Sequence, residues 1–222
     1  MTVLYEDNHL ILVNKASGEI VQGDKTGDKP LSEIVKEYLK EKYNKPGNVF
    51  CGVTHRLDRP TTGVVVFAKT SKALSRLNQS FREDKVDKTY WAIVKNSPPK
   101  HKDNLVHWLI KNEKNNKSTA YDKEKQGAKK AVLHYEIIGK SENYFLLEVN
   151  LETGRHHQVR AQFAKIGSPI KGDLKYGANR SNKDGSICLH ARSISFIHPV
   201  SKTKIEVTAP VPQDNLWQSF IL

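Results

Sequence analysis

Apolar residues gather in short runs along most of the chain, and only three segments show helical spacing. Short runs rich in β-branched or aromatic residues, bounded by Gly, Pro, Asn or Asp, predict strands. The predicted strands are Val3–Tyr5, Leu10–Val13, Val49–Val53, Val64–Ala68, Lys88–Lys95, Leu105–Ile110, Ala131–Ile138, Tyr144–Leu151, Ile187–Phe196 and Ile205–Ala209. Short polar turns follow the first and the seventh of these, so two hairpins are expected there.

Helices are predicted where apolar residues recur every three or four positions. One covers 31–43 and a second begins with Ser71 as its cap. A third lies within 154–167 and ends at Gly167. Because strands outnumber helices and the two do not alternate strictly, we expect an α+β fold with a mixed, mainly antiparallel central sheet and flanking helices. We expect one domain over residues 1–222, with a mobile, basic hairpin insertion in 95–130.

The charge balance of the chain indicates what kind of partner it binds. Among 222 residues, Lys+Arg total 36 against 24 Asp+Glu, a net charge of +12. This excess indicates a polyanionic partner, nucleic acid before an anionic membrane. No run approaches the roughly 18 apolar residues of a membrane span, and no signal peptide is evident. Cys51 and Cys188 lie in strand-like runs, as buried free thiols of a cytoplasmic protein would.

The segment His55–Gly63, HRLDRPTTG, is the strongest candidate for chemistry. It lies between two predicted strands, which would fix Asp58 between the guanidiniums of Arg56 and Arg59. A carboxylate in that setting suits a reactive site. It also suits an Asx-type turn before Pro60 with a local ion pair, and the residues alone leave both interpretations open.

A second candidate segment, 154–177, combines basic residues with glycines and the start of a helix. Its cations are Arg155, Arg160, Lys165, Lys171 and Lys175, against the single acid Asp173. This pattern predicts phosphate contact. Segment 111–130 has seven lysines but three acids, and we expect only a solvated face there.

Metal and cofactor sites are not expected. The nine histidines form no H-x-x-x-H or H-E-x-x-H pattern, and no carboxylate pair accompanies them. No Gly-rich phosphate loop of either nucleotide type occurs, so no nucleotide cofactor is predicted.

Five ordered motifs between residues 14 and 199 resemble those of the RluA-type pseudouridine synthases. HRLDRPTTG resembles the family's HRLD active-site motif, and NKASG (14–18) its early NKPSG segment. KTY (88–90) matches its K-x-Y motif. LETGRHHQVRAQFAKIGSPIKGDLKYG (151–177) follows its TGR-x-HQ block, and LHARSISFIHP (189–199) its LHA strand. The chain resembles the short members of the family that consist of the catalytic domain only.

The resemblance implies roles for single residues. It makes Asp58 the catalytic aspartate, Arg160 the arginine that pairs with it, and Tyr90 the tyrosine stacked beside a flipped-out uracil. We further expect substrate contacts from His55, Arg56, Arg155, His157 and Lys171, although Arg56 could equally support the loop and His55 could only pack. Two departures, His156 for Thr or Ser and Ala161-Gln162 for Val-His, are expected to bear on substrate choice.

The implied activity is isomerisation of specific uridines in structured RNA, tRNA or rRNA, by a cytoplasmic monomer without cofactor. The reaction exchanges the N1–C1′ bond for C5–C1′ without change of oxidation level, so a carboxylate that assists glycosyl transfer suits it. Stacking on Tyr90, worth about 1–3 kcal/mol, would offset base flipping. The alternatives are a catalytically idle RNA-binding protein that keeps the fold and, on weaker grounds, a metal-dependent nuclease.

Overall fold

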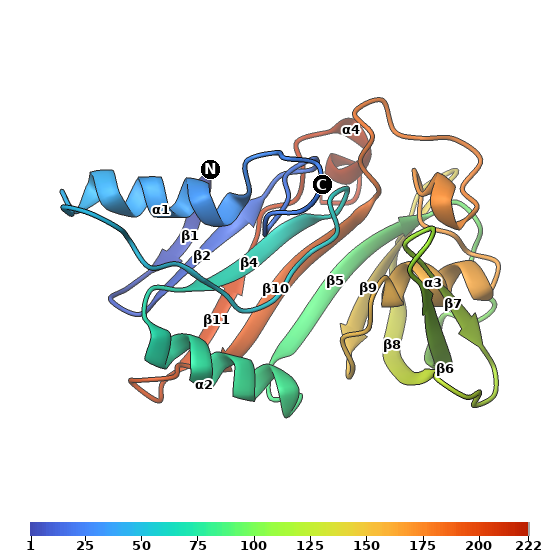
Figure 1. Cartoon of the computed structure of the whole chain (residues 1–222). Helices are drawn as coiled ribbons and strands as arrows, with labels where there is room; N and C mark the ends of the chain where they lie inside the picture. The colour runs from blue at the N-terminus through green and yellow to red at the C-terminus, as the bar shows by residue number, and fades with distance from the viewer. Residues whose placement is uncertain (222) are drawn as a thin grey trace. The chain divides into compact units, whose positions relative to one another are not determined.

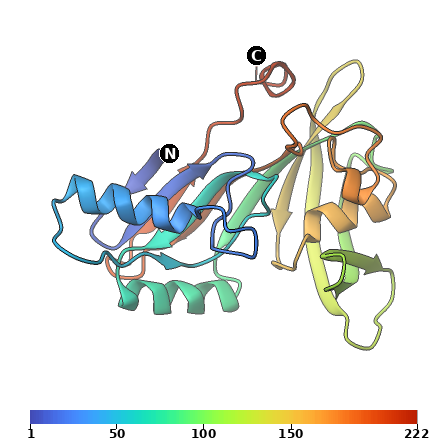
Figure 2. The same ribbon diagram turned by 45° about the horizontal axis from the view of Figure 1, so that its top comes forward.

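The computed structural model describes residues 1–221, and the chain divides into two compact units. Unit 1 comprises Met1–Val86 and Ala191–Pro210; unit 2 comprises Asp87–His190 and the C-terminal segment from Val211. The order of the elements along the chain can be followed by colour in Figures 1 and 2.

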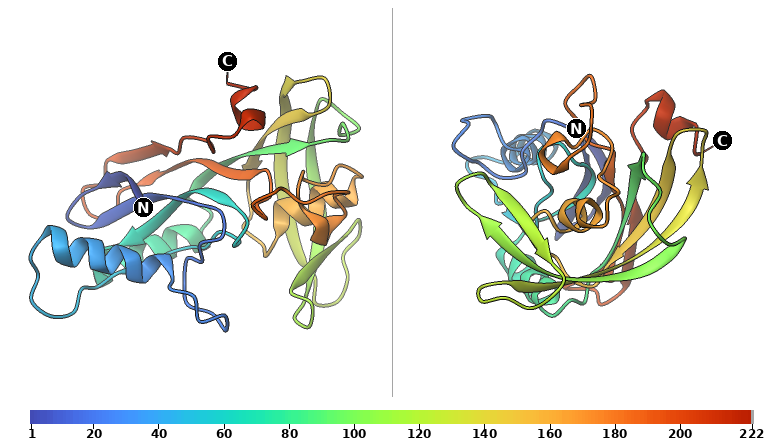
Figure 3. Two further views of the ribbon diagram at one scale, coloured as in Figure 1. Left: turned by 90° about the horizontal axis from the view of Figure 1, so that it is seen from above. Right: turned by 90° about the vertical axis from the view of Figure 1, so that its right-hand side faces the viewer.

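Unit 1 is a sheet with helices on one face. Its strands β1 (Thr2–Glu6), β2 (Leu10–Lys15), β4 (Thr62–Ala68) and β10 (Leu189–Ile197, of which residues from Ala191 belong here) are neighbours in that order. The short β3 (Gly52–Val53) pairs with β4, and β11 (Lys204–Thr208) pairs with β10. Helices α1 (Leu31–Lys42) and α2 (Ser71–Arg82) lie on the same face (Figures 1 and 3).

The core of unit 1 is built by its two central strands. Leu10–Val13 of β2 and Val64–Ala68 of β4 pair antiparallel and are buried on both faces. Such strands read as continuous apolar runs, which is how they appear in the sequence. The segments that precede and follow them are therefore attached to the most rigid part of the unit.

Unit 2 is a second antiparallel sheet. Its strand order is β5 (Asp87–Val94), β9 (Phe145–Leu151), β8 (Lys129–Lys140), β6 (Lys102–Asn112) and β7 (Lys117–Tyr121). The sheet curls around helix α3 (Gln158–Lys165), as the right-hand view of Figure 3 shows. A 3₁₀ helix η1 (Leu174–Tyr176) and the short α4 (Asn215–Gln218) complete the unit, and Trp217 of α4 packs in its core.

The predicted fold class, both hairpins and the three helices are confirmed. The strand predicted at Val49–Val53 is largely wrong, because only Gly52 and Val53 find partners in β4 and Phe50 is 45% exposed. The second helix is capped by the Thr70 side chain, which accepts from Ala73 N at 3.2 Å, and not by Ser71.

The segment 95–130 was expected to hold a mobile, basic hairpin insertion; the hairpin is present as β6 and β7, but it is part of the sheet and not an insertion. Strand β6 pairs with β8 over eight residue pairs, so the β6–β7 hairpin extends the sheet of unit 2. Strand β7 escapes sequence patterning because its buried positions, Ser118 and Ala120, are small or polar.

Candidate active site

The segment that carries Asp58 joins β3 to β4 in unit 1, and its first half is attached to both neighbours. The Thr54 hydroxyl donates to Val66 O at 2.7 Å, and His55 Nε2 accepts from Val66 N at 3.1 Å. The His55 ring also stacks on Phe81 of α2, with centroids 4.9 Å apart. Since Nε2 accepts, a neutral His55 carries its proton on Nδ1. These contacts give His55 a supporting role in the loop.

The second half of the loop is attached to Lys15, the last residue of β2. Lys15 is 1% exposed, and its ammonium donates to Ala16 O at 3.0 Å, Arg59 O at 3.0 Å and Thr61 O at 2.7 Å. Thr61 N donates to Asp58 O at 3.0 Å and closes the turn. Lys15 therefore fixes the backbone directly after Asp58.

Burial lowers the pKa of Lys15 to about 8. The carboxylates of Glu19 and Asp58 act in the opposite direction, and Arg59 acts with the burial. A buried ammonium is costly unless it is well hydrogen-bonded, and here three carbonyls satisfy its three donors.

Gly63 determines how the loop enters β4. Its φ is +115°, and a Cβ there would lie 2.3 Å from Ala191 O. Only glycine tolerates both the backbone angle and this approach of another strand.

The side chains of the loop differ in exposure. Asp58 is half-buried and Arg56 exposed, while Arg59 pairs with Asp28 at 2.6 Å. The second guanidinium of the predicted trio is thus held by a carboxylate outside the motif. Asp58 is left half open to solvent by a loop fixed at both ends.

In unit 2, helix α3 carries Arg160 into the interior. Arg160 is 4% exposed and forms a bidentate ion pair with Asp173, Nε to Oδ2 at 2.7 Å and a terminal nitrogen to Oδ1 at 2.8 Å. Asp173 is 1% exposed. Asp58 and Arg160 belong to different units, and their predicted pairing stays a prediction.

His157 and Tyr176 complete this arginine cluster. The guanidinium of Arg160 donates to His157 Nε2 at 3.2 Å, so a neutral His157 has its proton on Nδ1, which lies 2.9 Å from the Tyr176 hydroxyl. His157 adopts a left-handed backbone, φ 51°, immediately before α3. The predicted helix therefore begins only at Gln158.

The remaining predicted residues of unit 2 each have contacts of their own. Tyr90 is half-buried on β5, opposite Val149 of β9, and packs on the core of the unit. Arg155 is exposed, and its Nε donates to Lys130 O at 2.9 Å. Lys171 lines a pocket together with Lys95 and Arg180. The structure thus brings His157 and Arg160 together but not Arg155 or Lys171 with them.

Of the two departures from the family pattern, Gln162 lies wholly inside the unit. It is 0% exposed, and its amide nitrogen lies 3.1 Å from Leu105 O and 3.0 Å from His107 Nδ1. These contacts attach α3 to β6, which favours a structural role. His156 is half-buried, stacks on His157 at 3.8 Å and lies 2.9 Å from the Ser118 hydroxyl.

Sequence reasoning did not single out Lys15, Asp173 or Tyr176 as parts of these arrangements. All three lie inside quoted motifs, NKASG and the 151–177 block. The local signal of an internal ammonium was weak: Lys15 ends a strand that begins with four apolar residues, and a lysine is almost never fully buried unless its charge is paired.

Several other features complete the description. Within residues 1–221, no three His, Cys, Asp or Glu side chains are grouped to hold a metal ion. No helix in the same range is long and apolar enough to cross a membrane. Burial raises the pKa of the Cys188 thiol to about 11. Cys51 is half-buried, and burial raises the pKa of its thiol to about 12.

Comparison with known proteins relates the sequence to enzymes that act on RNA. Residues 9–165 match the model of a family described as RNA pseudouridylate synthase. A ribosomal large subunit pseudouridine synthase C of Buchnera aphidicola is 34% identical in an alignment 219 residues long, which covers 96% of this chain and 68% of that protein. A tRNA pseudouridine synthase C of Vibrio parahaemolyticus is 30% identical, over 98% of this chain and 92% of that protein.

Solved structures agree at the level of the fold. Human RNA Pseudouridylate Synthase Domain Containing 4 superposes with a TM-score of 0.79 at 22% identity, over 96% of this chain and 89% of that one. Human RNA Pseudouridylate Synthase Domain Containing 1 gives 0.71 at 21% identity, over 95% and 83%. By its match to the family model and its identity to these relatives, the chain belongs to the RNA pseudouridylate synthases, a family of isomerases.

Proposed function

We propose that this protein isomerises uridines of structured RNA, in tRNA or rRNA, to pseudouridine, and that its two units form one catalytic domain. Family membership supports the reaction, and the family match over 9–165 includes residues of both units. The relatives named above act, by their names, on tRNA or on the large ribosomal subunit. A net charge of +12 suits binding to a polyanion, and we propose that a cytoplasmic monomer carries out the reaction.

The observation that carries the proposal is the rigid mounting of Asp58. Its loop is hydrogen-bonded to β4 before the aspartate and to a buried ammonium after it. A group that must act at one atom of a substrate needs such support, because small displacements cost rate. A solvated turn would need neither a buried lysine nor a strained glycine.

The proposed chemistry balances without any added group. The N1–C1′ bond breaks, the uracil turns and the C5–C1′ bond forms; the hydrogen on C5 leaves as a proton, and N1 takes up a proton. Asp58 supplies the carboxylate that attacks or stabilises the sugar or the ring. Tyr90 replaces stacking lost by the flipped base, and Arg160 supplies positive charge to Asp58 while Asp173 and His157 fix its guanidinium.

The proposal gives different roles in substrate binding to five further residues, namely His55, Arg56, Arg155, His157 and Lys171. Arg56 and Arg155 are exposed and suit phosphate contact. His55 and His157 are engaged by their neighbours and act by supporting Asp58 and Arg160 respectively. Lys171 belongs to a pocket of its own.

The experiment is to map pseudouridine in tRNA and rRNA from cells with and without the gene. We expect one or more sites to return to uridine in the deletion strain and to be restored by the wild-type gene but not by Asp58→Asn. An idle RNA-binding protein would leave the map unchanged, and restoration by the Asp58→Asn gene would remove Asp58 from the reaction.

A further inference from the structure

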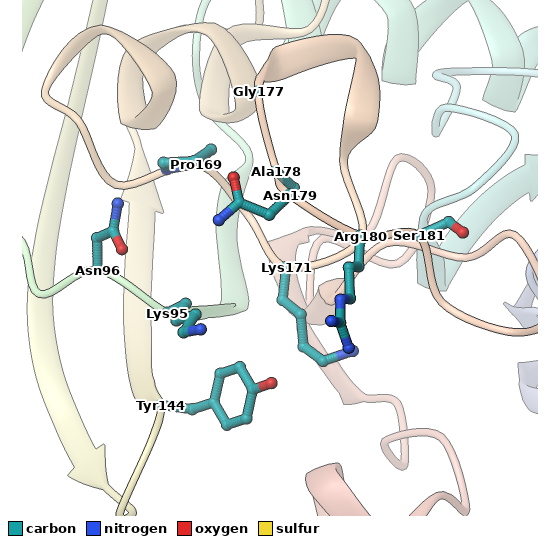
Figure 4. Close-up of a pocket in the computed structure, with 11 residues that line it drawn as sticks. Lys95, Asn96, Tyr144, Pro169, Lys171, Gly177, Ala178, Asn179, Arg180 and Ser181 are labelled. Carbon is teal, nitrogen blue, oxygen red and sulfur yellow. The ribbon is translucent and has the colours of Figure 1, made fainter.

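Unit 2 carries a pocket that the three proposed catalytic residues do not line (Figure 4). Its volume is about 560 Å³, within the range of roughly 300–1,000 Å³ that small-molecule sites occupy. Its lining includes Lys95, Tyr144, Lys171, Gly172 and Arg180.

The pocket is built where strand β5 ends. Val94, the last residue of β5, pairs with Phe145 of β9, and Lys95 and Tyr144 are the next residues beyond this pair. On the other side of β5, Val94 forms an antiparallel bridge with Ile170, and Lys171 N donates to Ile93 O at 2.9 Å, so Lys171 lies beside the last residues of β5. The pocket therefore gathers residues far apart in sequence at one end of a rigid sheet.

Lys171 is held in place by the loop that follows it. Its ammonium donates to Asn182 Oδ1, and the amide nitrogen of Asn182 donates to the Ser186 hydroxyl at 3.0 Å. Gly172 makes this packing possible, because its φ is +89° and a Cβ would lie 2.7 Å from Ser186 O. The lysine is thus positioned before any ligand arrives, which lowers the entropic cost of binding.

The charge of the pocket is of one sign. Its cations are Lys95, Lys171 and Arg180, and none of its eleven lining residues is acidic. In Figure 4 the side chains of Lys171 and Arg180 extend in the same direction from the backbone. The Asp184 carboxylate accepts from the Ser186 hydroxyl at 2.6 Å and from Ser186 N at 3.1 Å. Its pKa is lowered mainly by this hydroxyl and only slightly by Lys171. Three cations of this kind call for an anionic ligand.

Tyr144 adds a flat apolar surface to these cations. Its ring is half-buried, and the Lys171 ammonium lies 6.0 Å from its centroid. An aromatic ring beside Lys and Arg is the combination by which proteins hold single-stranded nucleotides, the base stacking while cations hold the phosphate.

We propose that this pocket binds one nucleotide of the RNA substrate other than the target uridine, with its phosphate on Lys95, Lys171 and Arg180 and its base on Tyr144. The proposal rests on the proposed function for the identity of the ligand as RNA. Lys95 follows the end of β5 and lies five residues after Tyr90, roughly 16 Å at the rise of a strand, so one nucleotide does not contact both. The pocket would add affinity and select the RNA around the target.

The test is the affinity of the full chain for cellular RNA made without this protein, measured by filter binding over a salt series. Lys95→Glu with Arg180→Glu should weaken binding tenfold or more and reduce the steepness of the salt dependence by about 1–2 in log–log slope. Lys114→Glu with Lys123→Glu makes the same charge change at exposed positions of unit 2 and should change affinity less than threefold. Thermal melting confirms that each variant folds.

Tyr144 separates stacking from charge. Tyr144→Ala should weaken binding by roughly 5- to 150-fold with an unchanged salt slope, and Tyr144→Phe should restore the wild-type affinity. Equal losses in both double variants would show diffuse charge and overturn the pocket. So would unchanged binding by Tyr144→Ala. Filter binding does not depend on catalytic activity. A protein that is inactive, but whose pocket variants still lose affinity for RNA, therefore refutes only the proposed function.

Discussion

Lys15 shows how one side chain can order a reactive loop from outside it. Its ammonium holds the carbonyls of Arg59 and Thr61, and a burial of this kind is stable only because three acceptors surround the charge. The motif singled out Asp58 as a candidate, and its part in the reaction stays a prediction. The role of Lys15 could not be predicted, because its partners are backbone atoms 44 and 46 residues away that no pattern of side chains reveals.

The lowered pKa of Lys15 predicts a pH dependence of stability. The folded value, about 8, lies below the ordinary 10.5, so the unfolded chain holds this proton more tightly. The wild type should therefore gain stability relative to Lys15→Met as pH rises from about 8 to 10.5, by a few kcal/mol at most. Urea unfolding at several pH values measures the difference. The exposed Lys123→Met is the control, and an equally flat profile for both variants would contradict the burial of a charged Lys15.

Arg160 predicts a double loss. Arg160→Ala leaves the buried carboxylate of Asp173 without its bidentate partner, which costs roughly 3–5 kcal/mol, and removes the charge proposed to act on Asp58. Denaturant unfolding measures the loss of stability. The loss of activity is measured by the release of tritium from RNA labelled at uridine C5, the hydrogen that the reaction expels. Asp173→Asn should lose stability as well, and an unchanged unfolding free energy in Arg160→Ala would contradict the pair.

Asp58→Asn should abolish turnover and leave RNA affinity within a few-fold of the wild type. Phosphate contacts supply most of the binding free energy, and one carboxylate supplies none of them. Filter binding and tritium release on the same preparation check both halves. Turnover near the wild-type rate would mean that Asp58 has no part in the chemistry.

At the scale of elements, periodicity predicted most of the structure. The apolar runs of β2 and β4 and the helical spacing of α1 gave their positions within one or two residues. The failures are β3 and β7, whose pairing depends on neighbours distant in sequence and not on their own apolar content. Strand limits set by tertiary partners are the part that local patterns do not contain.

Gly63 gives the prediction at this scale. Gly63→Ala and Gly127→Ala both place a Cβ on a residue with positive φ, +115° and +78°, but only at Gly63 does that Cβ meet backbone atoms, those of Ala191. Gly63→Ala should cost about 1–3 kcal/mol more than Gly127→Ala. Equal unfolding free energies for the two variants would show that β10 shifts freely away from β4.

At the scale of the whole molecule, the sequence predicted the fold class and the family but not the topology. Strand count and lack of alternation were sufficient for α+β. The order β5-β9-β8-β6-β7 was not predictable, because β6 and β8 are neighbours in the sheet although β7 lies between them in the sequence. The excess of positive charge, in contrast, is visible in composition alone and predicts a binding that weakens steeply with salt.

The most direct test of the central claim follows from the bonds exchanged. Moving the glycosidic link from N1 to C5 expels the hydrogen on C5, so RNA tritiated at uridine C5 should release label into water, one equivalent per modified site, with unchanged chain length. We expect release in the presence of EDTA and without added nucleotide, falling as salt rises. A nuclease would shorten the RNA and retain the label. Cellular RNA made without this protein that releases no tritium at any salt concentration would contradict the account.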